Sequence, residues 1–196
     1  MEEHIKYFDN VADEWDSLFL DKKKIEEMVN KMNISSKEMI LDVGCGTGKL
    51  IPFLQKKLKS VGLIYCLDFS IKMLLNAKKK NYSGVAKFIK GCAEKLPFKE
   101  NRFTRIICLA VFPHIADKKT SVKEFHRILQ TNGILNILHL MSREELNEFH
   151  KNLGGVLSKD VLPDEPTMKK ILKECGFKNI VIINKPSTYF VQCIKV

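Results

Sequence analysis

The stretch that most constrains this chain runs from Ile40 to Leu50, where apolar residues and an acid lead into alternate glycines. Its sequence, ILDVGCGTGKL, is typical of a buried strand that turns sharply into a helix. Glycine suits such a turn because it accepts positive φ and lets a ligand approach the backbone closely. The next helix, expected to begin near Lys49, would present unpaired N–H groups and a positive dipole end to that ligand. The stretch therefore predicts a nucleotide-type pocket at the carboxyl end of a first parallel strand.

The glycine spacing narrows the kind of ligand. A dinucleotide fingerprint reads G-x-G-x-x-G and a P-loop ends in G-K-[ST], whereas this chain has G-x-G-x-G, and leucine follows Lys49. The carboxylate of Asp42 at the mouth of the loop suits a ligand with positive charge better than a diphosphate. The stretch resembles motif I of the class I S-adenosylmethionine-dependent methyltransferases; a glycine-rich turn without a ligand is the alternative. The resemblance implies a cofactor-binding loop made of Asp42, Gly44, Cys45, Gly46 and Gly48.

Two later segments extend the resemblance. The apolar run 61–67 predicts a second buried strand, and Asp68 at its tip stands where such folds hydrogen-bond a ribose diol; an ordinary turn acid is the alternative. After a short strand at 85–90, the segment GCAEKLPF at 91–98 resembles the family's adenine-lining G-D-A-x-x-L-P-F, with Cys92 in place of the usual Asp. The resemblance implies that the cofactor site is completed by Phe69, Cys92, Ala93, Glu94, Leu109 and Ala110.

The order of the segments predicts one α/β domain. We expect a Rossmann-like, seven-stranded, mostly parallel sheet with helices on both faces, an antiparallel last strand and an N-terminal helical lid. Residues 1–33 would form the helical cap, 38–140 the cofactor-binding core, and 141–196 the acceptor-side helices and a closing hairpin. Strand five is expected at 134–140, after a turn at 131–133. The resemblance covers about residues 40–140 and points to the small-molecule branch with the ubiquinone and menaquinone C-methyltransferases.

The N-terminal segment 4–20 is predicted to be a helix whose apolar face carries Phe8 and Trp15. Related enzymes fold such a segment over the cofactor, so the resemblance implies that Tyr7 and Trp15 are lid residues and that Tyr7 contacts the cofactor. The alternative is that both side chains only anchor the helix to the domain.

Candidate residues for the acceptor half follow strands four and five. His114 ends the fourth strand, His139 lies near the end of the fifth, and Arg143, Asn147 and His150 share one face of the next helix. An arginine could hold an acidic acceptor, and a neutral imidazole could take a proton at physiological pH. The alternative is a solvated helix face beside two ordinary histidines. No H-x-x-x-H or H-E-x-x-H spacing favours a metal, and we expect none.

The net charge and the cysteine content indicate which macromolecular partners and which cellular compartment to expect. The formal net charge of +10 invites a nucleic-acid partner, but phosphate recognition favours arginine, and we expect the lysines to be solvated and nucleic acid to be an unlikely partner. The 33 basic residues include only four arginines, Arg102, Arg105, Arg127 and Arg143. The six cysteines form no C-x-x-C pair, and no apolar run approaches the roughly 20 residues of a membrane span. We therefore expect a cytoplasmic protein with free thiols, without a signal peptide.

These features together predict methyl transfer from S-adenosylmethionine to a small-molecule acceptor, with S-adenosylhomocysteine as the product. Such an in-line displacement needs alignment of the acceptor and exclusion of water more than covalent help from the protein. Two alternatives stay open: an RNA or protein methyltransferase, suggested by the charge, and a non-catalytic protein that keeps the cofactor fold. The sequence does not indicate the oligomeric state.

Overall fold

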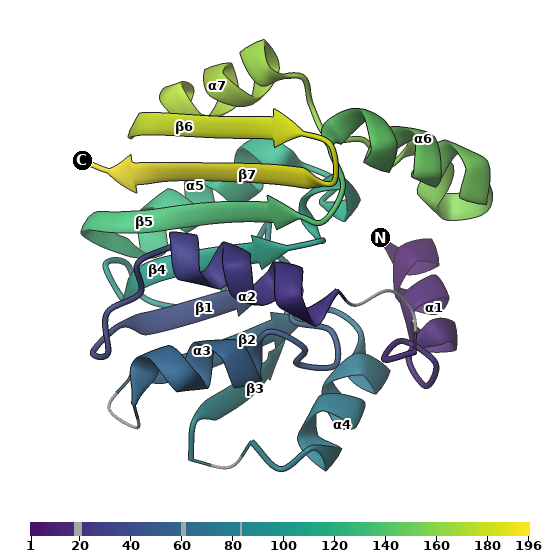
Figure 1. Ribbon diagram of the computed structural model, residues 1–196, viewed down its shortest axis with the longest axis horizontal. Coiled ribbons are helices and arrows are strands. Elements are labelled where there is room, and N and C mark those ends of the chain that lie inside the picture. The colour runs from purple at the N-terminus through teal and green to yellow at the C-terminus, as the bar shows by residue number, and fades with distance from the viewer. Residues whose placement is uncertain (18–20, 60–61, 83) are drawn as a thin grey trace.

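The computed structural model describes residues 1–17, 21–59, 62–82 and 84–196, which form a seven-stranded sheet in the order β3-β2-β1-β4-β5-β7-β6 (Figure 1). The neighbours from β3 to β5 pair in parallel, whereas β7 runs antiparallel to both β5 and β6. The predicted mostly parallel sheet with an antiparallel last strand is therefore confirmed. The strands are β1 (Met39–Val43), β2 (Leu63–Asp68), β3 (Ala86–Lys90), β4 (Phe103–Leu109), β5 (Leu129–His139), β6 (Phe177–Lys185) and β7 (Thr188–Lys195).

Helices cover both faces of the sheet and the edge where the parallel strands end. α2, α3 and α4 pack on one face, where Ile25, Leu54 and Leu74 join one buried cluster. α5 and α7 pack on the other through residues such as Phe125 and Leu172. The helices are α1 (Glu2–Val11), α2 (Lys22–Lys31), α3 (Ile51–Leu58), α4 (Ile71–Lys79), α5 (Lys118–Ile128), α6 (Arg143–Leu153) and α7 (Glu165–Glu174), with 3₁₀ turns η1 (Phe112–His114) and η2 (Gly155–Lys159).

The end of the sheet where β1, β4 and β5 terminate is bordered by α1 and α6. Figure 1 shows both helices beyond the arrowheads of these strands, on the right of the view. The register pairs Val43 with Leu67, so the chain that leaves β1 runs beside the last residue of β2, Asp68. Ligands of open α/β sheets bind at this edge, because several strands deliver their following loops there.

Three expected boundaries differ from the structure. The helix predicted over 4–20 ends at Val11 and gives way to turns, while residues 18–20 lie outside the described residues. The helix after the glycine loop begins at Ile51, because residues 45–50 are used by turns that close through Cys45 O and Gly48 O. β5 begins at Leu129. The residues of the expected turn at 131–133 belong to this strand, where the pairing with β4 is irregular and Asn132 has a φ of 63°.

Candidate functional site

The glycine loop after β1 is held to the tip of β2 by its own backbone. The N–H groups of Gly44 and Cys45 both donate to the carbonyl oxygen of Leu67, at 2.7 and 3.0 Å. Gly44 has a φ of 66°, and a Cβ there would come within 2.3 Å of Val111. Glycine is therefore required at this position by both the conformation and the close approach of β4's following loop.

Asp68 organises the same loop from the end of β2. Its Oδ2 accepts the N–H of Gly46 at 2.8 Å, and its Oδ1 accepts the N–H of Ser70 at 2.8 Å. Burial raises the pKa of Asp68 to about 6, although these two hydrogen bonds oppose the shift. Each carboxylate oxygen keeps a further lone pair, so the side chain can accept hydrogen bonds from a ligand as well.

Asp42 is the more deeply buried of the two acids, and it has fewer hydrogen bonds to described residues. It is 1% exposed, and its Oδ2 has no hydrogen-bond partner in the part of the chain that the structure describes. Burial, with the nearby charge of Asp68 as a smaller cause, raises the pKa of Asp42 to about 8. A buried carboxyl without a partner is costly, and a donor or cation placed beside it would remove that cost.

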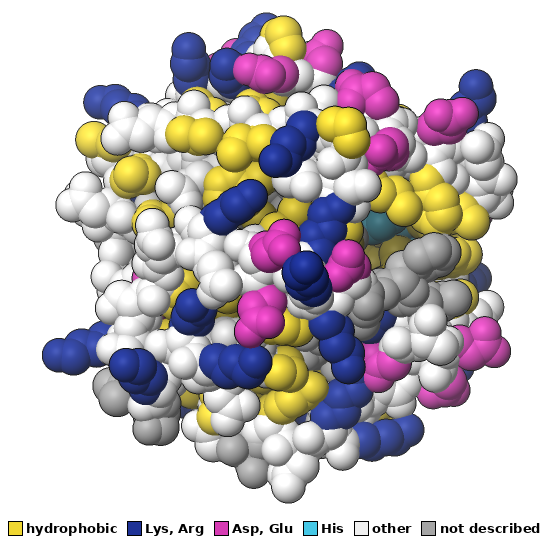
Figure 2. Space-filling view, viewed as in Figure 1, with side chains coloured by type: hydrophobic (Ala, Val, Ile, Leu, Met, Phe, Trp, Pro, Cys, Tyr) yellow, Lys and Arg dark blue, Asp and Glu magenta, His cyan; other side chains and the backbone are white. Residues whose placement is uncertain are grey.

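A cavity of about 460 Å³ lies between the glycine loop, α1 and α6, a size typical of small-ligand sites. Figure 2 shows on its right side a histidine in a hollow with an apolar wall. A smaller cavity of about 30 Å³ adjoins it, and Gly44, Asp68 and His114 line both. Of the predicted cofactor residues, those that line the larger cavity are Tyr7, Asp42, Gly44, Cys45, Gly46, Asp68, Phe69, Leu109 and Ala110. The smaller one is lined by Cys92, Ala93 and Glu94, and Gly48 lines neither.

The α1 segment closes the cavity with aromatic side chains. Phe8 is buried and makes edge-on ring contacts with Trp15 and Phe69 at centroid distances of 5.7 Å. Beyond the helix, Asp16 accepts the hydroxyl of Thr47 at 2.6 Å. The structure thus places Tyr7 and Trp15 at the cavity, where the lid hypothesis expects them.

Three histidines from three elements line the opposite half of the cavity: His114 of η1, His139 at the end of β5 and His150 of α6. His139 is buried, its Nε2 finds no hydrogen-bond partner among the described residues, and burial lowers its pKa to about 3. His139 is therefore an uncharged imidazole across the physiological pH range. The described residues contain no group of three or more His, Cys, Asp or Glu side chains placed to hold a metal ion.

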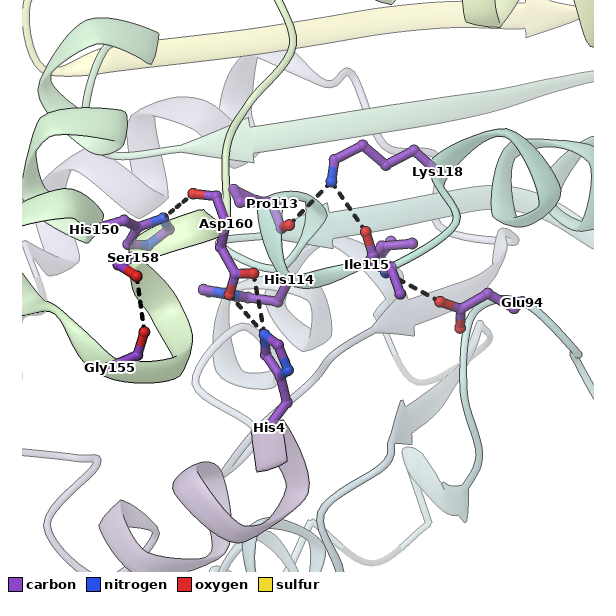
Figure 3. Close-up of polar contacts among 11 residues, drawn as sticks. His4, Glu94, Pro113, His114, Ile115, Lys118, His150, Gly155, Ser158 and Asp160 are labelled. Atoms are coloured by element: carbon purple, nitrogen blue, oxygen red, sulfur yellow. Dashed lines mark hydrogen bonds and ion pairs between the residues drawn. The ribbon is translucent and has the colours of Figure 1, made fainter. Parts of the chain in front are cut away.

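Asp160, which follows η2, joins two of the histidine-bearing elements (Figure 3). Its Oδ2 lies within hydrogen-bond distance of Nδ1 of His114, at 2.7 Å, and of Nε2 of His4, at 2.9 Å. Its main-chain oxygen accepts Nδ1 of His150 at 2.7 Å. Asp160 and His4 belong to no sequence motif, and their contact joins residues 156 positions apart, so neither could be predicted as a site residue.

The face of α6 that meets the cavity differs from the one expected. Leu146, Phe149, His150 and Leu153 line the cavity. Arg143 does not; its guanidinium pairs with Glu144 at 3.0 Å, and Asn147 is bonded to the backbone of Leu162. Of the three residues expected to share the cavity-facing side of α6, only His150 lines the cavity, because it lies at the edge of the apolar stripe formed by Leu146, Phe149 and Leu153. Arg143 stands outside the proposed acceptor half.

Comparison with known proteins agrees with this geometry. A family model described as a methyltransferase domain matches residues 41–137. A ubiquinone/menaquinone biosynthesis C-methyltransferase of Wigglesworthia glossinidia brevipalpis is 30% identical over 190 residues, covering 83% of this chain and 74% of the relative. A demethylmenaquinone methyltransferase of Geobacillus kaustophilus is 27% identical, over 86% and 82%. A crystal structure of a SAM-dependent methyltransferase from Aquifex aeolicus superimposes with a TM-score of 0.71 at 21% identity, over 88% and 89%.

A glycine loop and two acids at adjacent strand tips, opening into one cavity, define a nucleoside-binding α/β domain. The chain belongs to the class I S-adenosylmethionine-dependent methyltransferases, and it is an enzyme that uses S-adenosylmethionine. No helix among the described residues is long and apolar enough to cross a membrane.

The residues present fit this cofactor. The unpaired Oδ2 of Asp42 offers an acceptor to a cationic ligand, and the rings of Tyr7, Trp15 and Phe69 line the same cavity. Aromatic faces and carboxylates both favour a positively charged ligand, and the sulfonium group of S-adenosylmethionine carries such a charge. When bound, the cofactor supplies the methyl group; the protein's part is to hold the acceptor in line and to exclude water.

Proposed function

We propose that this methyltransferase acts on a small, largely apolar acceptor that binds in the half of the cavity bounded by η1, β5 and α6. The observation that carries the proposal is the continuity of the cavity, which runs from the glycine loop to the three histidines. The acceptor half is otherwise apolar, lined by Met141, Leu146, Phe149, Leu153 and Leu157. The names of the relatives, which are quinone-biosynthesis methyltransferases, support an acceptor of this kind.

The chemistry of the lining disfavours a permanently charged acceptor. His139 and His114 both have lowered pKa values because they are buried, so they are uncharged near neutral pH. Arg143 is directed to Glu144 rather than to the cavity. A charged acceptor would lose its hydration without gaining an ionic partner in this half, which is unfavourable.

The surface gives little support to the RNA or protein alternative. Figure 2 shows lysine and arginine side chains dispersed among acidic and apolar ones on the visible face. Several basic side chains are already paired, as in Lys119–Glu174 at 2.5 Å and Arg127–Glu124 at 2.6 Å. We therefore propose that the net charge of +10 serves solubility rather than nucleic-acid binding.

The cysteines suit a reducing compartment, and we propose that the enzyme works in the cytoplasm. All six are free thiols, and five of them are buried. Buried thiols behave as small apolar side chains, and burial raises the pKa of Cys193.

Turnover with radiolabelled S-adenosylmethionine tests the proposed acceptor class. The acceptors are a reduced demethylmenaquinone with a short side chain, an unmethylated tRNA and a lysine-rich peptide, each at low and at physiological salt. We expect methylation of the quinol alone. Methylation of the tRNA or the peptide would overturn the proposal, as would cofactor binding by calorimetry with no methylation of any quinol-like or phenolic acceptor.

A further inference from the structure

We propose that Asp160 is a positioning residue that fixes the tautomers of His114 and His150, so that both offer an unprotonated Nε2 to the acceptor. His114 is then the general base, and the acceptor belongs to the class with an acidic hydroxyl, an enol or phenol, whose proton must leave. The base assignment rests on the proposed small-molecule function; the tautomer assignment stands on the geometry alone.

The first tautomer is set by the side chain of Asp160. Burial alone would raise the pKa of Asp160, but the hydrogen bonds from His114 and His4 outweigh it and hold the pKa below its usual value. An ionised carboxylate only accepts hydrogen bonds, so the Nδ1 atom 2.7 Å away in His114 carries the proton. In the neutral ring, Nε2 then keeps its lone pair, and His114 lines the cavity in which the acceptor would bind.

The second tautomer is set by the main chain of the same residue. The carbonyl oxygen of Asp160 lies 2.7 Å from Nδ1 of His150. A carbonyl oxygen has no proton to give, so Nδ1 of His150 is a donor whatever the charge of Asp160. The rings of His114 and His150 lie 4.9 Å apart, and both line the cavity. One residue thus aligns two imidazoles through two different groups.

The backbone that carries His114 is also held in place. Lys118 donates its ammonium group to the carbonyl oxygens of Pro113 and Ile115, at 3.1 and 3.0 Å, one on each side of His114 (Figure 3). Proton transfer needs such a fixed geometry, because the efficiency of a general base depends first on its distance to the proton it takes.

The charges around His114 keep it neutral before the reaction. Burial lowers its pKa, the Asp160 carboxylate opposes that shift, and the imidazoles of His150 on α6 and His4 on α1 disfavour further positive charge. Lys118 on α5 adds a cation near Asp160. A neutral imidazole beside an ionised carboxylate can take a proton and have the resulting charge stabilised.

The proposed step transfers one proton and one methyl group. Nε2 of His114 takes the acceptor's O–H proton, a bond forms from the acceptor oxygen or its conjugated carbon to the methyl carbon, and the methyl–sulfur bond breaks with its electron pair left on sulfur. For carbon methylation, the proton on the methylated carbon is then lost to water, and His114 returns its proton to the acceptor oxygen, which restores the hydroxyl. No oxidant or reductant is required.

Histidine-selective ¹⁵N NMR at neutral pH measures the tautomers without any acceptor. In the wild-type protein we expect protonated Nδ1 and unprotonated Nε2 at both His114 and His150. In Asp160→Leu, which removes the side-chain acceptor but keeps the carbonyl, His114 should shift toward protonated Nε2 while His150 stays unchanged. His4→Ala is the matched control and should leave both tautomers as they are.

A wild-type His114 with protonated Nε2 would overturn the proposal, even if Asp160→Leu failed to fold. So would an unchanged His114 tautomer in a folded Asp160→Leu protein. With an accepted quinol or phenol, Asp160→Leu should lower kcat roughly 10²-fold or more and move the acidic limb of the pH profile, while affinity for S-adenosylhomocysteine stays the same. If no such acceptor is found, the proposed function fails but the NMR result still decides the tautomers.

Discussion

At the scale of single residues, the two acids at the strand tips have different tasks. Asp68 is satisfied by two backbone N–H groups, whereas one oxygen of Asp42 has no partner among the described residues. Their pKa values are raised to about 6 and about 8, with burial as the main cause in both. Asp42 is therefore the acid whose ionisation should follow the arrival of a cationic ligand.

This difference predicts how stability changes with pH. The folded-state pKa of Asp42, about 8, lies above the ordinary value of an aspartate, so the folded protein holds a proton that the unfolded chain has lost. The contribution of Asp42 to the free energy of unfolding must then fall as pH rises from about 4 to about 8, and Asp68 contributes only below about 6. The buried His139, whose pKa is lowered to about 3, gives an opposing rise that ends near the ordinary pKa of histidine, about 6.5. Urea unfolding from pH 7 to 8, where most histidines of the unfolded chain are already neutral, should show a loss of up to about 1.4 kcal/mol per pH unit.

Asp42→Asn is the matched variant, because the amide has the same shape but does not titrate. Its free energy of unfolding should fall less than that of the wild type over pH 7–8. Parallel pH profiles of the two proteins would contradict the assignment of the raised pKa to Asp42.

At the scale of elements, α6 presents only one of its faces to the acceptor half of the cavity. Phe149 faces the cavity and Arg143 does not. Phe149→Ala should raise KM for the acceptor roughly tenfold, since a lost apolar contact of this size is worth about 1–3 kcal/mol, and should leave cofactor affinity unchanged. Arg143→Ala on the same helix is the control and should change neither. An acceptor KM that responds to Arg143→Ala alone would refute this orientation of α6.

α1 is expected to act as a lid that opens separately from the core. Its buried cluster, Phe8 with Ala12, Met73 and Leu157, is distinct from the two clusters that line the sheet. Phe8→Ala should therefore speed hydrogen exchange of α1 amides and the release of S-adenosylhomocysteine, while β1 amides keep their protection. Leu75→Ala, which truncates an exposed side chain on α4, is the control. Equal loss of protection in α1 and β1 would show that the lid and the core open together.

Elements whose signals are local could be predicted from the sequence. The side chains of Ser70, Asp117 and Ser142 cap α4, α5 and α6, and such caps can be read from the sequence because they depend on neighbouring residues alone. Asp160 could not be found that way, because its partners His4 and His114 meet it only in the folded chain. The face of α6 was missed because helical spacing tells which residues share a face but not which neighbours that face meets.

At the scale of the whole molecule, the net charge of +10 affects how fast charged molecules reach the protein rather than how the acceptor binds in the cavity. An uncharged acceptor that enters a mostly apolar pocket feels little long-range field. We therefore expect kcat/KM for the acceptor to change less than about threefold between 50 and 300 mM salt, since salt screens only the interactions of charges. A loss of about 10³ or more over such a range, as phosphate-contacting proteins show, would instead indicate a nucleic-acid substrate.

We propose that the cofactor lies across the tips of β1 and β2, where the glycine loop, both acids and the aromatic side chains of α1 line the same cavity. A crystal structure of the protein with S-adenosylhomocysteine measures this directly. We predict density for the ligand in the 460 Å³ cavity, with its sugar hydroxyls at Asp68 and its amino-acid part against the glycine loop. Density elsewhere, or a cavity left empty at saturating ligand, would contradict the account.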